Sequence, residues 1–323
     1  MSNKSKDAAL LHSERQFSYT LIDDYHSQFL DKKTGFFSEK YVSYRKCPVC
    51  GADDTVKILD KSGGTYVKCR ACTMVYTNPG FTESALIEYY QKLDTKQGEI
   101  VSNESDFYTE IYTGGLMCIE EKQHTGSILD MGCSTGFFLD IAKTRGWRTA
   151  GIELGIKEAE ECKTKGHKLY TSILEELVFD EGFDAITLWD VFEHLLDGKK
   201  YLRLLGDALN PNGLIFLQIP NSGALASKVM RASCRMFDGL EHVSLYNPKT
   251  IHMLADLSGF EVISMRTVIS EVAVVNNYLS YDDPYFGKSD YDNFSGILNV
   301  LTEKIIHDSL LGYKIQVILR KKH

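Results

Sequence analysis

The chain has 323 residues and a net charge of −8, from 36 basic and 44 acidic side chains. This acidic balance argues against broad binding to a phosphate backbone, and no apolar run approaches the about 20 residues of a bilayer span. The first ten residues, MSNKSKDAAL, lack the apolar stretch of a signal peptide, so we expect a cytoplasmic protein that binds no membrane. Eight cysteines in such a chain favour a metal site over a disulfide framework.

A cysteine module is predicted at residues 47–80, after a polar N-terminal arm at residues 1–46. Two Cys-x-x-Cys pairs, with 18 residues between them, supply Cys47, Cys50, Cys69 and Cys72. Each two-residue gap lets one tight turn aim both sulfurs at one ion, and this spacing is typical of a zinc ribbon. The residues between the pairs predict a β-hairpin that turns at Ser62-Gly63-Gly64. Four thiolates leave no open coordination position, so we expect structural zinc.

Residues 81–323 are predicted to form one α/β domain. Two helices, at 82–91 and 111–123, lead into β-branched runs that alternate with amphipathic segments, as in βαβ units with a parallel sheet. The strands are predicted at 127–132, 148–154, 167–173, 183–191, 214–221, 260–268 and 313–321. The helices between them are predicted at 137–146, 156–166, 198–209 and 248–259. A turn is expected at 210–213, and two insertions, at about 222–246 and 277–310, interrupt the alternation.

A glycine turn joins the first predicted strand of this domain to its first helix. In LDMGCSTGFFL, which begins at Leu129, Gly132 and Gly136 let the backbone come close to a ligand and leave amides exposed at a helix N-terminus. About 20 residues later the second strand ends at Glu153, where a carboxylate can accept the hydroxyl hydrogens of a ribose. The DxGxxxG spacing, with Asp130 at the strand end, disfavours a pyrophosphate and favours a cationic adenosyl ligand.

These motifs together resemble the class I S-adenosylmethionine-dependent methyltransferases over about residues 105–270. WDVFEHLLD and NPNGLIFLQIPN are similar to the fourth-strand and fifth-strand motifs of that family. The resemblance implies S-adenosylmethionine as cofactor and a Rossmann-like α/β methyltransferase fold. It also implies a seven-stranded, mostly parallel sheet whose last strand is antiparallel, with a small N-terminal zinc ribbon. The implied cofactor-binding residues are Asp130, Met131, Gly132, Cys133, Ser134, Gly136, Phe137, Glu153, Leu154, Ser172, Ile173, Trp189 and Asp190. Ser172 stands where many relatives have an aspartate for the adenine.

Two histidines are candidates for a catalytic base. Transfer of a sulfonium methyl is an in-line displacement that mainly needs placement, but a hydroxyl, amine or carbon-acid acceptor also needs a base. His194 follows Glu193 after the fourth strand. His242 follows Glu241 at the end of the first insertion. We expect His242 to take the acceptor proton while Glu241 orients it, with His194 as the second candidate.

The segment around His242 is similar to a motif of zinc-containing sugar methyltransferases. The Glu-His pair, Ser244 and Tyr246 keep that motif, but Gly239 stands where those enzymes have a tyrosine. This departure weakens the case for C-methylation. In a purely structural alternative, His242 caps Asn247 and the helix that follows.

The sequence therefore favours an enzyme that methylates a small polar acceptor. The resemblance implies a sugar or nucleotide-linked sugar in polysaccharide or secondary-metabolite biosynthesis. Two alternatives are an RNA- or protein-modifying methyltransferase whose zinc ribbon docks the substrate, and a non-catalytic cofactor-binding module. The acidic balance and the lack of a Lys/Arg run along the ribbon disfavour RNA. The oligomeric state and the choice among oxygen, nitrogen and carbon acceptors stay open.

Overall fold

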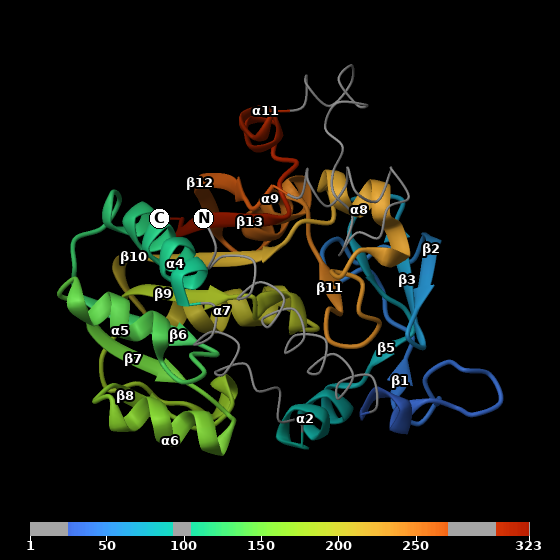
Figure 1. The fold of residues 1–323 in the computed structure, drawn as a ribbon, viewed down its shortest axis with the longest axis horizontal. Helices are drawn as coiled ribbons and strands as arrows, with labels where there is room; N and C mark the ends of the chain where they lie inside the picture. Colours follow the sequence, from blue (N-terminus) through green and yellow to red (C-terminus); the bar gives the residue numbers. More distant parts are fainter. Residues whose placement is uncertain (1–24, 93–104, 271–301, 323) are drawn as a thin grey trace, which may run out of the picture. The chain divides into compact units, whose positions relative to one another are not determined.

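The computed structural model describes residues 25–92, 105–270 and 302–322. Figure 1 shows its ribbon. Most of the second expected insertion, at 277–310, lies outside the described residues, as does the first half of the N-terminal arm. The chain divides into two compact units. The first comprises Met1–Val42, Phe81–Trp189 and Leu204–Phe216, and the second comprises Ser43–Gly80, Asp190–Arg203 and Leu217–His323.

A seven-stranded sheet contains all seven strands predicted for the α/β domain. These strands are β6 (Ser127–Met131), β7 (Arg148–Ile152), β8 (Lys168–Tyr170), β9 (Phe183–Trp189), β10 (Leu209–Pro220), β12 (Phe260–Val268) and β13 (Lys314–Lys321). Their order is β12-β13-β10-β9-β6-β7-β8. β6 pairs in parallel with β7 and β9, β7 pairs in parallel with β8, and β12 pairs antiparallel with β13. The predicted mostly parallel sheet with an antiparallel last strand is confirmed.

Burial explains why these runs form strands. Ile128 and Leu129 of β6 are fully buried, and so are most residues of β9 and of the second half of β10. Parallel strands covered on both faces have near-continuous apolar sequences rather than an alternating pattern, which these segments have. Helices cover the sheet in the ribbon (Figure 1).

Except for α4 (Ser105–Glu120), which begins six residues before its predicted start at 111, the predicted helices begin and end close to their predicted limits. The four predicted between strands are α5 (Phe137–Thr144), α6 (Ile156–Thr164), α7 (Gly198–Asp207) and α9 (Pro248–Leu257). The remaining helices are α2 (Glu83–Lys92), α4 (Ser105–Glu120), α8 (Leu225–Met230) and α11 (Glu303–Asp308). Glycines with φ between 79° and 94° follow α5 and α6, and the one after α9 has φ 82°. Such left-handed residues satisfy the last carbonyls of a helix at little steric cost.

One predicted turn lies within a strand. β10 begins at Leu209, so it includes residues 210–213, where a separate turn was expected. The Asn210 side chain donates from Nδ2 to Asp184 Oδ1 at 2.9 Å, which ties this segment to the beginning of β9. Asn212 takes the left-handed conformation (φ 66°), as asparagine does more readily than most residues. The turn chemistry is present, but the strand pairing continues through it.

The second unit contains a four-stranded antiparallel sheet built on the cysteine module. Its strands are β2 (Thr55–Lys61), β3 (Gly64–Cys69), β4 (Val75–Thr77) and β11 (Ser244–Leu245), in the order β11-β4-β3-β2. The β2–β3 hairpin turns at Ser62 and Gly63, as predicted, and both residues have positive φ. β11 comes from the first insertion and pairs with β4, so the module is completed by a strand from far along the chain.

Short elements complete the described fold. The 3-10 helices are η1 (Ser27–Phe29), η2 (Leu174–Glu176), η3 (Phe192–His194) and η4 (Arg231–Ser233), and β1 (Val42–Ser43) pairs with β5 (Gly80–Phe81). In the first unit, Phe29 and Phe37 of the N-terminal arm pack edge-to-face against Phe81. None of the helices in the described ranges combines the length and apolar character that a membrane span requires.

Candidate functional site

The glycine turn of the first unit lies between β6 and α5. Gly132 and Gly136 have φ 78° and 80°, and Ser134 between them has φ 47°. The amide of Ser134 donates to Glu153 Oε2 at 2.8 Å, and the amide of Gly155 donates to Glu153 Oε1 at 2.7 Å. Glu153 therefore sits beside the turn with each oxygen held by one amide. Each oxygen keeps a lone pair for a second donor, as a ribose hydroxyl would need.

Two further observations fit a ligand at this turn. Ser134 Oγ is buried and has no hydrogen-bond partner among the residues that the structure describes. Such an orphaned polar atom calls for a partner from outside the chain. Burial raises the pKa of Glu153, and the amides of Gly155 and Ser134 oppose that rise. A donor that hydrogen-bonds to the ionised carboxylate would lower this pKa again.

Asp130 faces the neighbouring strand within the sheet. It accepts a hydrogen bond from Thr187 Oγ1 of β9 at 2.7 Å and is almost fully buried. Burial raises the pKa of Asp130 well above its ordinary value, although the bond from Thr187 acts in the opposite direction. Burial therefore disfavours the charged form of Asp130, while at the carboxylate of Glu153 two amide hydrogen bonds oppose this effect of burial.

Trp189, at the end of β9, belongs to an aromatic cluster of the first unit. Its ring lies 4.7 Å from that of Tyr112, 5.1 Å from that of Phe138 and 4.6 Å from that of Phe216. A Cβ added to Gly115 of α4 would come within 2.3 Å of the indole. This tight packing makes Trp189 a core residue, while its Nε1 has no partner among the described residues.

The remaining predicted cofactor residues surround the same turn or follow the next strands. Met131, Gly132, Cys133 and Phe137 lie on the turn and at its two ends, with Cys133 buried. Leu154 follows Glu153 and is 43% exposed, which leaves it free to contact an adenosyl group. Ser172 and Ile173 are half-buried between β8 and η2.

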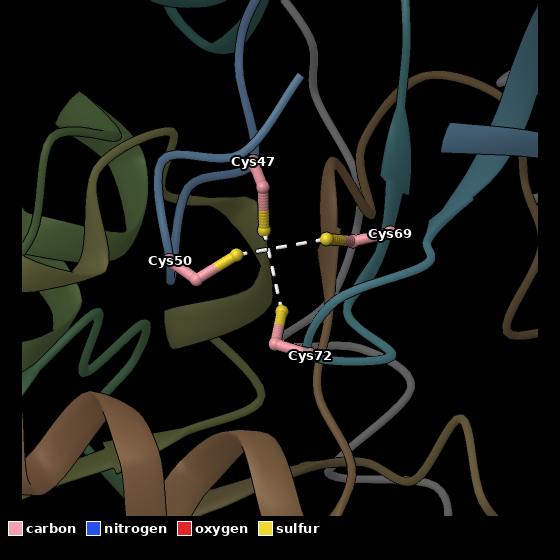
Figure 2. Close-up of side chains that lie close together, drawn as sticks. All are labelled: Cys47, Cys50, Cys69 and Cys72. Atoms are coloured by element: carbon pink, nitrogen blue, oxygen red, sulfur yellow. Dashed lines mark hydrogen bonds between the residues drawn. The ribbon is translucent and has the colours of Figure 1, made fainter. Parts of the chain in front are cut away.

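The four predicted metal ligands come together in the second unit. The ligand atoms of Cys47, Cys50, Cys69 and Cys72 lie within 4.8 Å of one another, and Figure 2 shows their sulfurs converging. The Sγ atoms of Cys47 and Cys72 are 3.4 Å apart, and those of Cys50 and Cys69 are 3.6 Å apart. Tetrahedral zinc, with Zn–S bonds of about 2.3 Å, needs sulfurs about 3.8 Å apart. All four are free thiols, so the cluster fits a tetrahedral ion.

His242 is held by its Nδ1 atom. This nitrogen lies 2.8 Å from the carbonyl oxygen of Met236 and 3.0 Å from Asp238 Oδ2. Since a carbonyl only accepts, Nδ1 carries the hydrogen, and in the neutral ring the lone pair is on Nε2. Asp238 is itself fixed, because its Oδ1 accepts the amides of Leu240 at 2.8 Å and Glu241 at 2.9 Å. Met236 and Asp238 therefore fix the orientation of the imidazole.

The structure also removes the capping alternative for His242. Asn247 is the N-cap of α9, and its side chain accepts from the amide of Thr250 at 3.1 Å. Thr250 Oγ1 in turn accepts from the amide of Asn247 at 2.8 Å, which completes a reciprocal capping box. The helix is capped without the histidine.

Glu193 and His194, on η3, lie close to His242. Glu193 Oε1 is 4.0 Å from His242 Nε2, and the His194 and His242 rings are edge-to-face with centroids 5.1 Å apart. Glu193 is fully buried, and neither of its oxygens has a hydrogen-bond partner among the described residues. Burial, together with the charge of Asp190, raises the pKa of Glu193 to about 7.

The two histidines have opposite acid–base characters. Burial lowers the pKa of His194 well below its usual value, and the positive charges of His242 and Lys314 act in the same direction. Burial also acts to lower the pKa of His242, but the carboxylates of Asp238 and Glu193 outweigh it, so this pKa is raised. His242 therefore has the stronger affinity for a proton.

Asp190 is ion-paired in the second unit. Lys314 Nζ lies 2.8 Å from Asp190 Oδ1, and Gln218 donates to Asp190 Oδ2 at 3.1 Å. Asp190 also has a left-handed backbone (φ 55°), which β9 reaches directly after Trp189. Strain of this kind persists only where surrounding contacts impose it. The sequence predicts that Asp190 contacts the cofactor. Its side chain is 36% exposed despite the contacts with Lys314 and Gln218.

Comparison with known proteins shows which family this fold is similar to. Residues 110–265 match a family model described as a methyltransferase domain. This part of the chain is therefore similar to methyltransferase domains. The seven-stranded sheet is the one that class I methyltransferases share, and it supports the predicted fold class.

Two relatives and one solved structure place the domain further. The chain is 26% identical over 132 residues to a ubiquinone biosynthesis O-methyltransferase of Methylocella silvestris, covering 39% of this chain and 49% of that protein. It is 31% identical over 110 residues to the mitochondrial enzyme of the same name from Bos taurus, covering 31% of this chain and 30% of that protein. The chain thus spans about half or less of these relatives.

The solved structure is that of the plantazolicin methyltransferase BpumL, in complex with a desmethyl plantazolicin analogue and S-adenosylhomocysteine (SAH). It superposes with a TM-score of 0.50 at 13% identity, covering 74% of this chain and 95% of that chain. At this identity the likeness shows the fold alone.

Two residues of the candidate site, Asp238 and Lys314, were not predicted from the sequence. Asp238 stands four residues before His242, a spacing that indicates contact only on a helix, and this segment is not helical. Lys314 lies at the beginning of β13, far along the chain from Asp190. The contact of Asp238 had no signal because the segment is a loop, and the contact of Lys314 had none because it joins distant segments of the chain.

Proposed function

We propose that the chain is an S-adenosylmethionine-dependent methyltransferase with a hydroxyl-bearing small molecule as acceptor and His242 as its base. The observation that carries the proposal is the fixed ring of His242, with Nδ1–H held by Met236 and Asp238. A fixed tautomer with a free Nε2 lone pair is what a general base needs. The ubiquinone-pathway relatives are named O-methyltransferases, which supports oxygen as the accepting atom.

Donor binding is assigned to the glycine turn and Glu153. When bound, S-adenosylmethionine supplies a methyl group on a sulfonium that is already activated for displacement. The Glu153 carboxylate, held in place by the Ser134 amide, is the group that would bind its ribose, and the buried Ser134 hydroxyl offers a further contact. A cationic ligand suits this turn better than a pyrophosphate, because Glu153 would repel phosphate charge.

His242 Nε2 takes the proton that leaves the acceptor oxygen. The imidazolium that forms is stabilised by Asp238 at Nδ1 and by the Glu193 carboxylate 4.0 Å from Nε2. A positioned base of this kind contributes about 10²- to 10⁴-fold to a rate. His194 is the weaker candidate, since burial keeps its ring neutral and poorly basic.

We infer that the acceptor is a sugar or nucleotide-linked sugar and that the four cysteines hold structural zinc. Sugar hydroxyls are weak acids and need the base that His242 provides, and the likeness of the Glu-His-x-Ser segment to sugar methyltransferases points the same way. Four thiolates at the observed spacing leave no open ligand position, so the metal has no part in the chemistry. Residues of the same unit contact the hairpin of the module. This occupied surface disfavours the alternative in which the ribbon docks RNA or protein.

The test is His242→Gln, assayed for methyl transfer to a panel of nucleotide sugars and phenols with radiolabelled donor. We expect kcat to fall at least 100-fold, while the affinity for S-adenosylhomocysteine, measured by calorimetry, stays within threefold of wild type. His252→Gln, at an exposed position of α9, is the matched control and should keep full activity. Undiminished turnover in His242→Gln would refute the assigned base. A wild-type chain that binds the product but methylates nothing would favour the non-catalytic alternative.

A further inference from the structure

We infer that Tyr66 of the cysteine module is a positioning residue for the Asp238–His242 pair. The inference rests on the proposed function only in taking His242 as the base. The phenol of Tyr66, on β3, hydrogen-bonds to the backbone within residues 238–242. Through this contact the module fixes the imidazole that receives the proton.

The Tyr66 hydroxyl sits inside the loop that carries the base. It accepts from the amide of Gly239 at 3.1 Å and donates to the carbonyl of His242 at 3.2 Å. Asp238 Oδ1 lies 3.5 Å from the same hydroxyl, at the outer limit of a hydrogen bond. The side chain is fully buried, so both backbone groups would lose their partner if the hydroxyl were removed.

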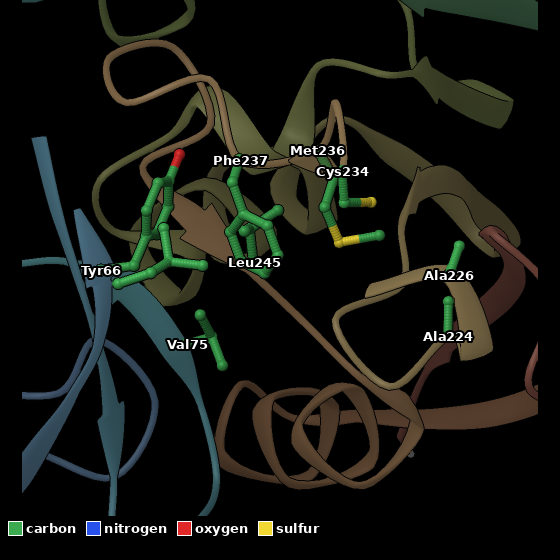
Figure 3. Packing of buried hydrophobic residues seen from close by; sticks show 9 residues of the cluster. Tyr66, Val75, Ala224, Ala226, Cys234, Met236, Phe237 and Leu245 are labelled. Carbon is green, nitrogen blue, oxygen red and sulfur yellow. The ribbon is translucent and has the colours of Figure 1, made fainter. Parts of the chain in front are cut away.

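Packing keeps the Tyr66 ring in this place. Tyr66 meets Phe237 edge-to-face with centroids 5.1 Å apart, and Val75 and Leu245 belong to the same buried cluster. Figure 3 shows these side chains together, drawn from β3, β4 and the segment around β11. Burial raises the pKa of Tyr66 well above its ordinary value, so the hydroxyl stays a donor at all working pH values.

Two glycines bring the hairpin and the loop into direct backbone contact. A Cβ at Gly64 would come within 2.1 Å of the carbonyl oxygen of Gly239. A Cβ at Gly239, whose φ is 95°, would come within 2.2 Å of the carbonyl oxygen of Lys61. Neither position has room for a side chain. The tyrosine of the sugar-methyltransferase motif therefore cannot occupy residue 239 in this fold, and Tyr66 places a phenol against the backbone of that residue instead.

A second anchor follows the loop. The Arg45 guanidinium donates to the carbonyl of Val243, next to His242, and at 3.1 Å to the carbonyl of Leu196, two residues after His194. β11 then pairs with β4 from Ser244 onward. Burial lowers the pKa of Arg45 to about 10, which still leaves it charged at neutral pH. The segment that carries the base is thus held by Tyr66 of the module at Gly239 and His242, and by Arg45, which precedes the module, at Val243.

The test compares Tyr66→Phe with Tyr76→Phe in the full chain purified with its metal. Both tyrosines are fully buried on adjacent strands, but the Tyr76 hydroxyl has no hydrogen-bond partner among the described residues. We expect Tyr66→Phe to lower kcat about 10- to 100-fold, because a misplacement of about 1 Å can cost 10²-fold. Acceptor KM and the affinity for S-adenosylhomocysteine should stay within threefold. Tyr76→Phe should leave kcat within twofold.

A readout independent of turnover separates positioning from mere stability. In histidine-labelled protein, the His242 resonance, assigned by its absence from His242→Gln, should titrate at lower pH in Tyr66→Phe than in wild type. The reason is that a loosened loop weakens the contact between Asp238 and Nδ1. An unchanged titration with unchanged kcat would overturn the inference. If His242→Gln retains activity while Tyr66→Phe still shifts this titration, the base assignment fails and the positioning role stands.

Discussion

The turn at residues 132–136 is held by groups nearby in the chain, whereas residues 238–242 are held by side chains from far away. The amides of Gly132 and Ser134 bond to Ile152 and Glu153, the end of the next strand. The loop of His242, by contrast, is fixed by Tyr66 and Arg45, more than 170 residues earlier. Donor binding should therefore survive damage that abolishes the chemistry, and three substitutions test that separation.

The largest effect is expected from Cys72→Ser. Loss of one metal ligand removes much of the free energy that a structural zinc site adds to folding, so we expect the free energy of unfolding to fall by about 4 kcal/mol or more. Activity should be lost with it, because Tyr66 belongs to the module and Arg45 lies two residues before its first cysteine ligand. S-adenosylhomocysteine affinity, measured by calorimetry at low temperature, should change less than fivefold.

The matched control for this cysteine is Cys118→Ser. Cys118 lies half-buried on α4, outside the four-thiol cluster. It should bind metal in the wild-type ratio, measured by atomic absorption, and keep its activity. Equal metal content in Cys72→Ser and wild type would contradict the assigned site. A complete loss of product affinity in Cys72→Ser would show that the two regions are not separable.

An intermediate effect is expected from Glu153→Gln, which acts on the other region. The glutamine side chain has an NH₂ group in place of one carboxylate oxygen, so a donor would face the donating N–H of Ser134 or Gly155. The charged acceptor for the ribose is lost as well. A hydrogen bond to a charged group contributes about 1.5–3 kcal/mol, so product affinity should fall about 10- to 100-fold. The His242 titration should not move. Glu160→Gln, an exposed residue of α6, controls for the lost charge and should bind normally.

The same contrast explains what could be predicted from the sequence. The glycine turn and Glu153 were found because a strand, a turn and a helix follow each other within one local motif. The clustering of the four cysteines could be predicted because two Cys-x-x-Cys pairs at this spacing are typical of one shared ion site. Asp238 and Tyr66 were not predicted. The two residues are brought together by the pairing of β11 with β4, and a strand of two residues has no periodicity that a sequence could show. The orienting role of Glu241 stays a prediction, because adjacency in sequence does not by itself determine contact in a loop.

The smallest and most specific effect is expected from Glu193→Gln. The Glu193 pKa is raised to about 7 by burial, so the folded state favours its protonated form. Stability from this group is therefore fully present below its ordinary pKa and is lost as the pH rises through about 7. Glu193→Gln should unfold at a higher temperature than wild type at pH 8 and at nearly the same temperature at pH 4.5.

The same variant should also shift the acid limb of kcat. Glu193 raises the pKa of His242, so its neutral replacement lets the imidazole lose its proton at lower pH and moves the limb in that direction. The expected displacement is at least about 0.7 pH unit, since a unit charge about 4 Å away contributes about 1 kcal/mol even at the dielectric constant of water. Glu176→Gln, on η2 of the first unit, should change neither the melting temperature nor the limb. A limb that stays in place in Glu193→Gln would mean that a group other than His242 controls the proton transfer.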